Sequence, residues 1–205
     1  MAATYYFVTD IEADGPSPLV NSMLSFASVA LRDDGVVCGE FETVLRPLAG
    51  RGSNPSTMAW WADQPEAWAA ATLDPQDPAT EMKRFVRWVE SFDGTRGFAA
   101  RPLLFDGMWI DQYLRLFTDT TIFGVPYWGP VVFSGLSLDI ESYAIGVFNR
   151  RGMPRPHGPV PADWLGDHPH THRAIDDARG YANYLSRLFA IAAHAPRVAQ
   201  DFLDG

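Results

Sequence analysis

The sequence predicts a mixed α/β fold in which a central sheet carries helices packed against it. Three strand-like segments follow one another near the N-terminus, and helical segments then alternate with short apolar runs. No repeat, low-complexity run or linker divides the 205 residues, and hydrophobic residues make up 47% of them. We therefore expect one domain, spanning residues 1–205 and large enough to bury a sizeable core.

The first three predicted strands form an antiparallel group. Residues 4–9 are aromatic and β-branched without a helical period, and residues 23–31 and 36–46 share that character. Arg32-Asp33-Asp34-Gly35 has the composition of a hairpin turn, so we expect a meander at one edge of the sheet. The only cysteine, Cys38, excludes an internal disulfide and is expected to fill a small apolar space in the third strand.

The later elements are predicted from helical spacing and apolar runs. Met82, Phe85 and Val89 recur at helical spacing and predict a helix over residues 79–92. Residues 47–80, interrupted by proline and glycine, are assigned no regular element. The remaining expectations are a short strand at 97–100, extending as far as 104, a helix at 105–117 with Trp109, Tyr113 and Leu116 on its apolar face, a strand or helix start at 138–140, a loop at 150–170 and a last helix at about 172–193.

Acidic residues stand where the predicted elements end or begin. Asp10 and Glu12 are two residues apart at the end of the first strand, so their side chains share one face. Two neighbouring carboxylates repel each other unless a cation lies between them, although a solvated strand end is the alternative. Asp106 follows an apolar run at a strand-to-helix turn, where it can equally serve as a helix N-cap. Asp111, five residues later, is expected to be solvated on the helix.

A histidine and an aspartate stand at the start of the last predicted helix. Five residues rotate a helix by about 140°, so His172 and Asp177 face one site only if His172 precedes the first turn. Asp176 is expected to point elsewhere and to favour the positive end of the helix dipole. His168, His170 and His172 alternate and can chelate a metal, but no H-x3-H or cysteine partner accompanies them, so a structural zinc site is not predicted.

If the fold brings these acids together, they cannot remain unpaired in a dry cleft. A divalent metal is the simplest solution, and a histidine beside it would act as a base. The pattern therefore indicates hydrolysis of phosphodiesters.

In this order the residues resemble the DEDDh branch of the DnaQ-like 3′-to-5′ exonucleases, a ribonuclease T-like group with the ribonuclease H-like fold. The family's D-x-E, its aspartate after an aromatic residue, and its H-x-A-x-x-D are matched by Asp10 and Glu12, by Phe105-Asp106, and by His172, Ala174 and Asp177. Thr57, Trp60, Trp61, Gln64 and Ala67 are also similar to a stretch of phage-type members. Arg101-Pro102 departs from the His-Asn that many relatives carry, which puts the local turn in doubt.

The resemblance implies a central mixed sheet, with antiparallel strands 1–3 and then parallel strands, flanked by helices. It implies a metal-dependent exonuclease that acts on single-stranded RNA or DNA, or on short oligonucleotides, and releases nucleoside 5′-monophosphates. Two Mg²⁺ or Mn²⁺ ions would be held by the four carboxylates, those of Asp10, Glu12, Asp106 and Asp177, with His172 as the base. A homodimer is one state to expect.

Substrate contacts follow from the same resemblance. The backbone of Ala13, Asp14 and Gly15 would approach the terminal nucleotide, and Met23 and Leu24 would wedge against its bases. Trp60 or Trp61 would stack on a base, because stacking suits single strands of any sequence. Arg150, Arg151 and Arg155 would follow the phosphates, or else form a solvated cluster.

Charge and composition limit the other functions and partners that the chain could have. The net charge of −9 argues against binding to long duplexes by phosphate neutralisation, but metal-binding carboxylates inflate that count. No run approaches the ~20 apolar residues that span a bilayer, and the first residues lack a signal-peptide pattern, so we expect a cytoplasmic protein with no membrane partner. Two alternatives stay open: a non-catalytic module that binds nucleic acid or protein, and a phosphodiesterase that acts on nucleotides or dinucleotides.

Overall fold

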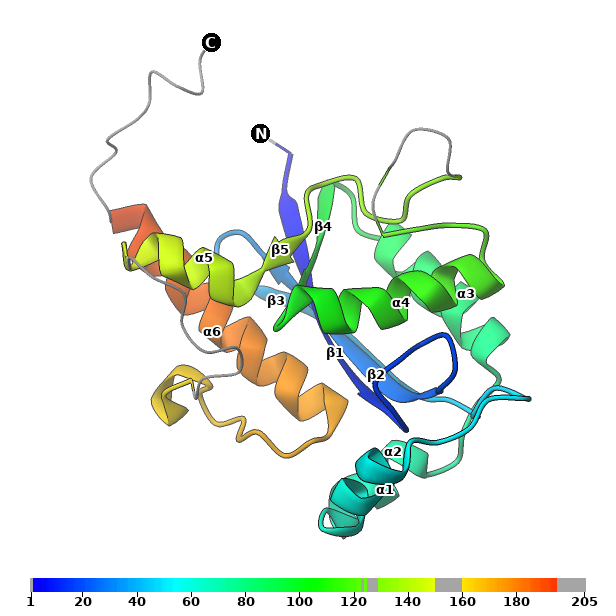
Figure 1. Ribbon diagram of the computed structural model, residues 1–205. Coiled ribbons are helices and arrows are strands. Elements are labelled where there is room, and N and C mark those ends of the chain that lie inside the picture. Colours follow the sequence, from blue (N-terminus) through cyan, green and yellow to red (C-terminus); the bar gives the residue numbers. More distant parts are fainter. Residues whose placement is uncertain (1, 123, 125–128, 150–159, 195–205) are drawn as a thin grey trace.

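The computed structural model describes residues 2–122, 124, 129–149 and 160–194. Its centre is a five-stranded sheet in the order β3-β2-β1-β4-β5 (Figure 1). The strands are β1 (Thr4–Ala13), β2 (Met23–Arg32), β3 (Val37–Val44), β4 (Thr95–Ala100) and β5 (Leu138–Asp139). The pairs β1–β2 and β2–β3 are antiparallel, whereas β1–β4 and β4–β5 are parallel. The predicted mixed sheet, with its antiparallel meander at one edge, is confirmed.

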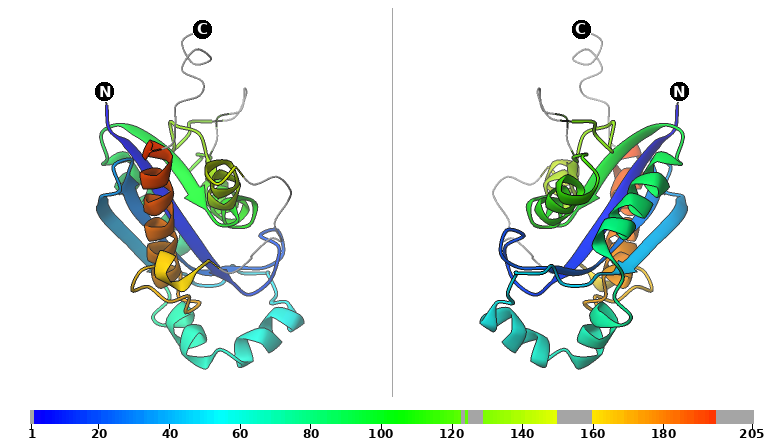
Figure 2. Two further views of the ribbon diagram at one scale, coloured as in Figure 1. Left: turned by 90° about the vertical axis from the view of Figure 1, so that its left-hand side faces the viewer. Right: turned by 90° about the vertical axis from the view of Figure 1, so that its right-hand side faces the viewer.

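Helices cover both faces of this sheet (Figure 2). They are α1 (Pro55–Ala62), α2 (Pro65–Thr72), α3 (Pro78–Glu90), α4 (Leu103–Phe117), α5 (Ile140–Val147) and α6 (Ala174–His194), with a short 3₁₀ helix at Ala162–Trp164. Alternation along β1 divides the core, because Phe7 and Ile11 pack with the side chains of α3 and α4, while Val8 packs with those of α5 and α6. Among the described residues, no helix is both long and apolar enough to cross a membrane.

Residues 47–80, to which the sequence assigned no element, contain α1, α2 and the start of α3. Each helix begins with a proline, at Pro55, Pro65 and Pro78. Proline is favourable at the first helical position, because that position needs no N–H donor. The prolines that make the segment look irregular are therefore helix starts. Figure 1 shows α1 and α2 beyond the end of β1, at the opposite end of that strand from its start at Thr4.

Three smaller expectations were wrong. Cys38 lies in β3 but is exposed, because the β2–β3 register shifts there and leaves it without a partner residue. Leu116 is also exposed, and the apolar face of α4 is completed instead by Ile110 and Leu114. Helix α4 begins at Leu103, so the fourth strand stops at Ala100 and does not extend to residue 104.

Candidate active site

Four carboxylates from three separate elements converge at the end of β1. Asp10 and Glu12 lie on β1, Asp106 lies in the first turn of α4 and Asp177 in the first turn of α6. All four are buried, and all four line one cavity of about 380 Å³. Carboxylate oxygens of Asp10, Glu12 and Asp177 lie within 4.8 Å of one another.

The strand pattern explains why α4 can reach this place. The β1–β4 pairing ends at Val8 and Ala99, whereas β1 continues to Ala13. Beyond Val8, the first turn of α4 lies beside β1 in place of β4. There the backbone N–H of Ile11 donates to the carboxylate of Asp106. Asp106 is therefore neither an N-cap nor solvated: it is 3% exposed and lies against the open edge of β1.

Burial and mutual repulsion disfavour the ionised forms of this cluster. Burial raises the pKa of Asp10 well above its usual value, and the charges of Asp106, Glu12 and Asp177 add to the effect. The pKa of Glu12 is raised well above normal by burial and then by Asp177 and Asp106. Burial also raises the pKa of Asp106 strongly, against the opposing effect of the Ile11 N–H. The cluster therefore favours either bound protons or a cation.

The donor atoms fit a divalent metal ion. Oδ2 of Asp106 is fully buried and has no hydrogen-bond partner among the described residues. An orphaned carboxylate oxygen is costly unless a cation meets it. Oxygen donors from several carboxylates are the set that hard divalent ions prefer. The cluster thus has the composition of a divalent-metal site.

His172 stands at the rim of the same cavity. It lies two residues before α6 with φ of +58°, so it precedes the first turn, as the sequence analysis required. Its ring meets that of Trp60 edge-on, with centroids 4.8 Å apart. Partial burial, and then the neighbouring His170, lower the pKa of His172 below 6.5, against the effect of Asp177. The lowered pKa favours the neutral imidazole, which is the form that can accept a proton.

Asp177 makes its closest contacts with residues of the turn before α6, and not with His172. Its Oδ1 accepts the backbone N–H of Thr171 at 2.9 Å, and its Oδ2 lies 2.8 Å from Nδ1 of His170. His170 was missed as a site residue, although the alternating histidines signalled it. Asp176 is turned away, as expected, and accepts the hydroxyl of Thr171 at 2.9 Å.

Comparison with known proteins gives a clear answer for structure and none for sequence. The sequence matches neither a protein-family profile nor a curated protein. The structure is similar to E. coli exonuclease I in a zinc-bound complex with single-stranded DNA, with a TM-score of 0.61 and 14% identity over 95% of this chain. It is also similar to a full-length 3′-exonuclease, with a TM-score of 0.62 and 14% identity over 93% of this chain and 83% of that one.

A third solved structure is the nuclease domain of 3′hExo, described as a DEDDh family member bound to rAMP. Its TM-score is 0.58, with 13% identity over 91% of this chain and 92% of that domain. The chain shares the fold of these exonuclease structures. It spans 41% of the length of exonuclease I, so that protein contains much that this chain does not.

Several expected substrate contacts disagree with the structure. Met23 and Leu24 are buried in the core, so the predicted wedge against bases is wrong. Trp61 is 2% exposed, and its indole N–H donates to the carbonyl of Ala13 at 3.0 Å, so it presents no face for stacking. Trp60 is 40% exposed and stands beside His172. Of the two tryptophans, only Trp60 remains available to a base.

The segment after Glu12 turns tightly beside the site. Asp14 accepts the backbone N–H of Ser22 at 2.6 Å, and a Cβ on Gly15 would collide with the side chain of Asn21. Contact between this segment and a nucleotide stays a prediction. Leu19 and Val20 are strongly exposed in the same loop, and the sequence analysis did not single them out. Arg150, Arg151 and Arg155 lie outside the described residues.

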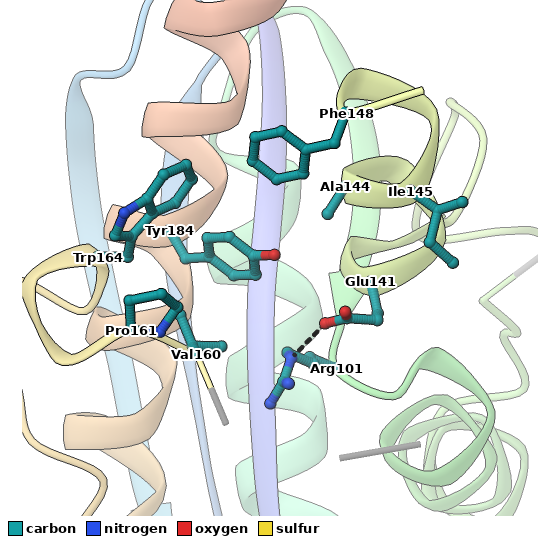
Figure 3. Close-up of a pocket in the computed structure, with 9 residues that line it drawn as sticks. All are labelled: Arg101, Glu141, Ala144, Ile145, Phe148, Val160, Pro161, Trp164 and Tyr184. Carbon is teal, nitrogen blue, oxygen red and sulfur yellow. Dashed lines mark hydrogen bonds and ion pairs between the residues drawn. The ribbon is translucent and has the colours of Figure 1, made fainter. Parts of the chain in front are cut away.

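Arg101 occupies the place where the sequence departs from the family pattern. Its Nε lies 3.0 Å from Glu141 Oε2, and its guanidinium lies 5.5 Å from the ring centre of Tyr181. It lines the carboxylate cavity and also a neighbouring cavity of about 310 Å³. Figure 3 shows the Arg101–Glu141 ion pair in this second cavity, which the rings of Trp164 and Tyr184 also line.

Asp111 has a structural role away from the cluster. Its Oδ1 accepts the N–H of Ile122 at 2.9 Å, and its Oδ2 lies 2.6 Å from Nε of Arg115. The expectation that it is solvated was wrong. The aspartate of α4 that enters the cavity is Asp106.

Proposed function

We propose that the chain is a metal-dependent 3′-to-5′ exonuclease that hydrolyses single-stranded RNA or DNA and releases nucleoside 5′-monophosphates. The observation that carries the proposal is the burial of four carboxylates in one cavity that His172 also lines. A binding module does not need four buried acids in one cavity, where neighbouring carboxylates add to the raised pKa values of Asp10 and Glu12. The DEDDh fold agrees with the proposal, because the compared structures are exonucleases by description.

Asp10, Glu12, Asp106 and Asp177 would hold two Mg²⁺ or Mn²⁺ ions. Such ions, when bound, lower the pKa of water and stabilise the leaving 3′-oxygen. The chain's own contribution is to hold the four carboxylates in fixed positions. The Ile11 N–H fixes Asp106, and the Thr171 N–H fixes Asp177.

His172 would take the proton from the attacking water. Burial lowers the pKa of His172, which favours the unprotonated ring that this role requires. Its place in the cavity lining, before α6 and with Trp60 against its ring, supports this role.

The substrate would lie across this rim. Trp60 would stack on one base, and the backbone at Ala13, Asp14 and Gly15 would meet the terminal nucleotide. The arginines at 150, 151 and 155 would follow the phosphates. The compared structures include complexes of exonuclease I with dT13 and of a 3′-exonuclease with a histone mRNA stem-loop, so the sugar of this chain's substrate stays open. A homodimer also stays a prediction.

A second candidate is a phosphodiesterase for dinucleotides or other short phosphodiesters. The net charge of −9 favours it, because a long strand would be repelled beyond the rim. Dependence of kcat/KM on length separates the two. For an exonuclease, kcat/KM should rise with each added nucleotide up to several. For the short-substrate enzyme, kcat/KM should be highest with two nucleotides.

A time course on 5′-labelled single-stranded RNA and the matching DNA tests the proposal, with Mg²⁺ or Mn²⁺ and an Asp106→Asn control. We expect a ladder that shortens from the 3′ end and is absent in the control, and the faster substrate identifies the sugar. The proposal is overturned if neither the wild type nor the control degrades the RNA, the DNA or dinucleotides.

A further inference from the structure

A second group of metal-ligating side chains lies beside the carboxylates. His170, His172 and Asp177 each offer a donor atom, and these atoms lie within 4.8 Å of one another. Hydrolysis as proposed above uses His172 and Asp177 but assigns nothing to His170. Asp177 belongs to both groups, since it also lies within the same distance of Asp10 and Glu12.

The turn before α6 builds this group. His170 and His172 are alternate residues, and the positive φ of His172 brings the two rings to 4.4 Å between centroids. Asp177 is held from the other side by the N–H of Thr171, so its Oδ2 is directed to Nδ1 of His170 at 2.8 Å. One carboxylate and two imidazoles therefore face a common point.

Donor type determines which ion suits this point. Two nitrogens and one oxygen, with a further position open to water, is a set that binds Zn²⁺. Imidazole favours zinc and neighbouring transition metals, whereas Mg²⁺ prefers oxygen donors alone. Donors in a tetrahedral zinc site lie about 3.4 Å apart, given bonds of about 2.0–2.1 Å. The side chain of His170 is 45% exposed and can make the remaining adjustment.

We propose that His170, His172 and Asp177 form a site for an exchangeable transition-metal ion of the zinc type, distinct from the all-carboxylate site. An ion there occupies Asp177 and the ring of His172. It therefore competes with the ions and the base that hydrolysis requires. The competition rests on the proposed function, whereas the binding does not.

Calorimetric titration of Zn²⁺ into the metal-stripped, tag-free full chain tests the binding. His170→Asn removes a ligand but keeps a hydrogen-bond donor for Asp177, and Asp10→Asn weakens only the carboxylate site. We expect Zn²⁺ affinity to fall on the order of tenfold or more in His170→Asn and to stay near wild type in Asp10→Asn. Circular dichroism confirms that both variants are folded.

Cobalt gives a second readout that needs no activity. Co²⁺ in the wild-type chain should show the visible bands of nitrogen ligation with low coordination number, and His170→Asn should lose them. The proposal is overturned if His170→Asn binds Zn²⁺ as tightly as wild type, or if Asp10→Asn loses affinity as His170→Asn does.

If the chain hydrolyses nucleic acid, Zn²⁺ should inhibit the Mg²⁺-supported reaction, and His170→Asn should need about tenfold more Zn²⁺ for the same inhibition. An inactive chain that still binds Zn²⁺ through His170 refutes only the proposed function.

Discussion

The ring of Trp60 in α1 lies edge-on against the ring of His172, 4.8 Å away between centroids, although 112 residues separate them in sequence. This contact joins a helix that the sequence did not predict to the histidine proposed as the base. It also contributes to the burial that keeps the pKa of His172 below 6.5.

Trp60→Ala should therefore alter the pH dependence of hydrolysis. Loss of the indole exposes His172, so its pKa should rise toward 6.5 and the acid limb of the kcat profile should move to higher pH. The loosened ring should also lower kcat, by up to about 10²-fold. Trp60→Phe keeps a ring and is the matched control. An unchanged acid limb in Trp60→Ala, measured together with the His172 NMR titration, would contradict this role.

His172→Ala should lower kcat by roughly 10²–10⁴-fold, because the proton acceptor is lost while the four carboxylates remain. Mn²⁺ affinity should stay near wild type. His194→Ala, at the exposed end of α6 where the ring contacts the carbonyl of Ala190, is the control and should keep full activity. A loss of Mn²⁺ binding in His172→Ala would show that this histidine is a ligand of the hydrolytic metal and not a base.

Asp106→Asn should abolish hydrolysis and yet stabilise the metal-free protein at pH 7, by on the order of 1 kcal/mol. The amide removes a buried charge that repels Asp10 and keeps a similar shape. Thermal unfolding without metal measures this. Added Mn²⁺ should stabilise the wild type more than the variant, since ligand binding to the folded state stabilises it by mass action.

Stability without metal should fall as the pH rises. The pKa values of Asp10, Glu12 and Asp106 are raised in the folded state above usual values of 3.8 and 4.5, so the folded chain holds protons that the unfolded chain releases. Their contribution is complete below about pH 4 and is lost as the pH rises through the raised values. The lowered pKa of His172 acts in the opposite direction, but only up to pH 6.5. The free energy of unfolding of the wild type minus that of Asp106→Asn, measured with denaturant from pH 5 to 9, should decline as the pH rises. A difference that does not change with pH would refute the raised pKa of Asp106.

Asp111→Ala should cost stability and spare the site. The change removes the hydrogen bond from the N–H of Ile122 and the contact with the guanidinium of Arg115. The free energy of unfolding should fall by about 1–3 kcal/mol. The folded variant should keep wild-type kcat and Mn²⁺ affinity. Inactivation by Asp111→Ala with activity retained in Asp106→Asn would show that the carboxylate of α4 has been assigned to the wrong residue.

The sheet and the acidic motifs were predictable because they rest on local patterns. Apolar runs with period two predict β1, β2 and β3, and strand ends carry Asp10 and Glu12 to one face. Convergence with Asp106 and Asp177 needed the family resemblance, since chain order does not show which helix start meets which strand. Helix α1 was missed because Pro55 reads as a helix breaker when it is a helix start.

The details of the site depend on long-range contacts that no local pattern contains. The burial of Met23 follows from its packing in the core with side chains of α3 and α4, and Trp61 is buried in a separate apolar cluster with Leu24 and Ala67. The partnership of His170 with Asp177 depends on the positive φ of His172 in the turn between them. These features required the three-dimensional structure.

Anomalous diffraction from crystals of the full chain soaked in Mn²⁺ and a nucleoside 5′-monophosphate tests the central claim most directly. The account predicts two peaks about 3.5–4 Å apart between Asp10, Glu12, Asp106 and Asp177, with the phosphate against them and His172 facing it. No manganese among these carboxylates at saturating concentration, or an ion held only by His170 and His172, would contradict it.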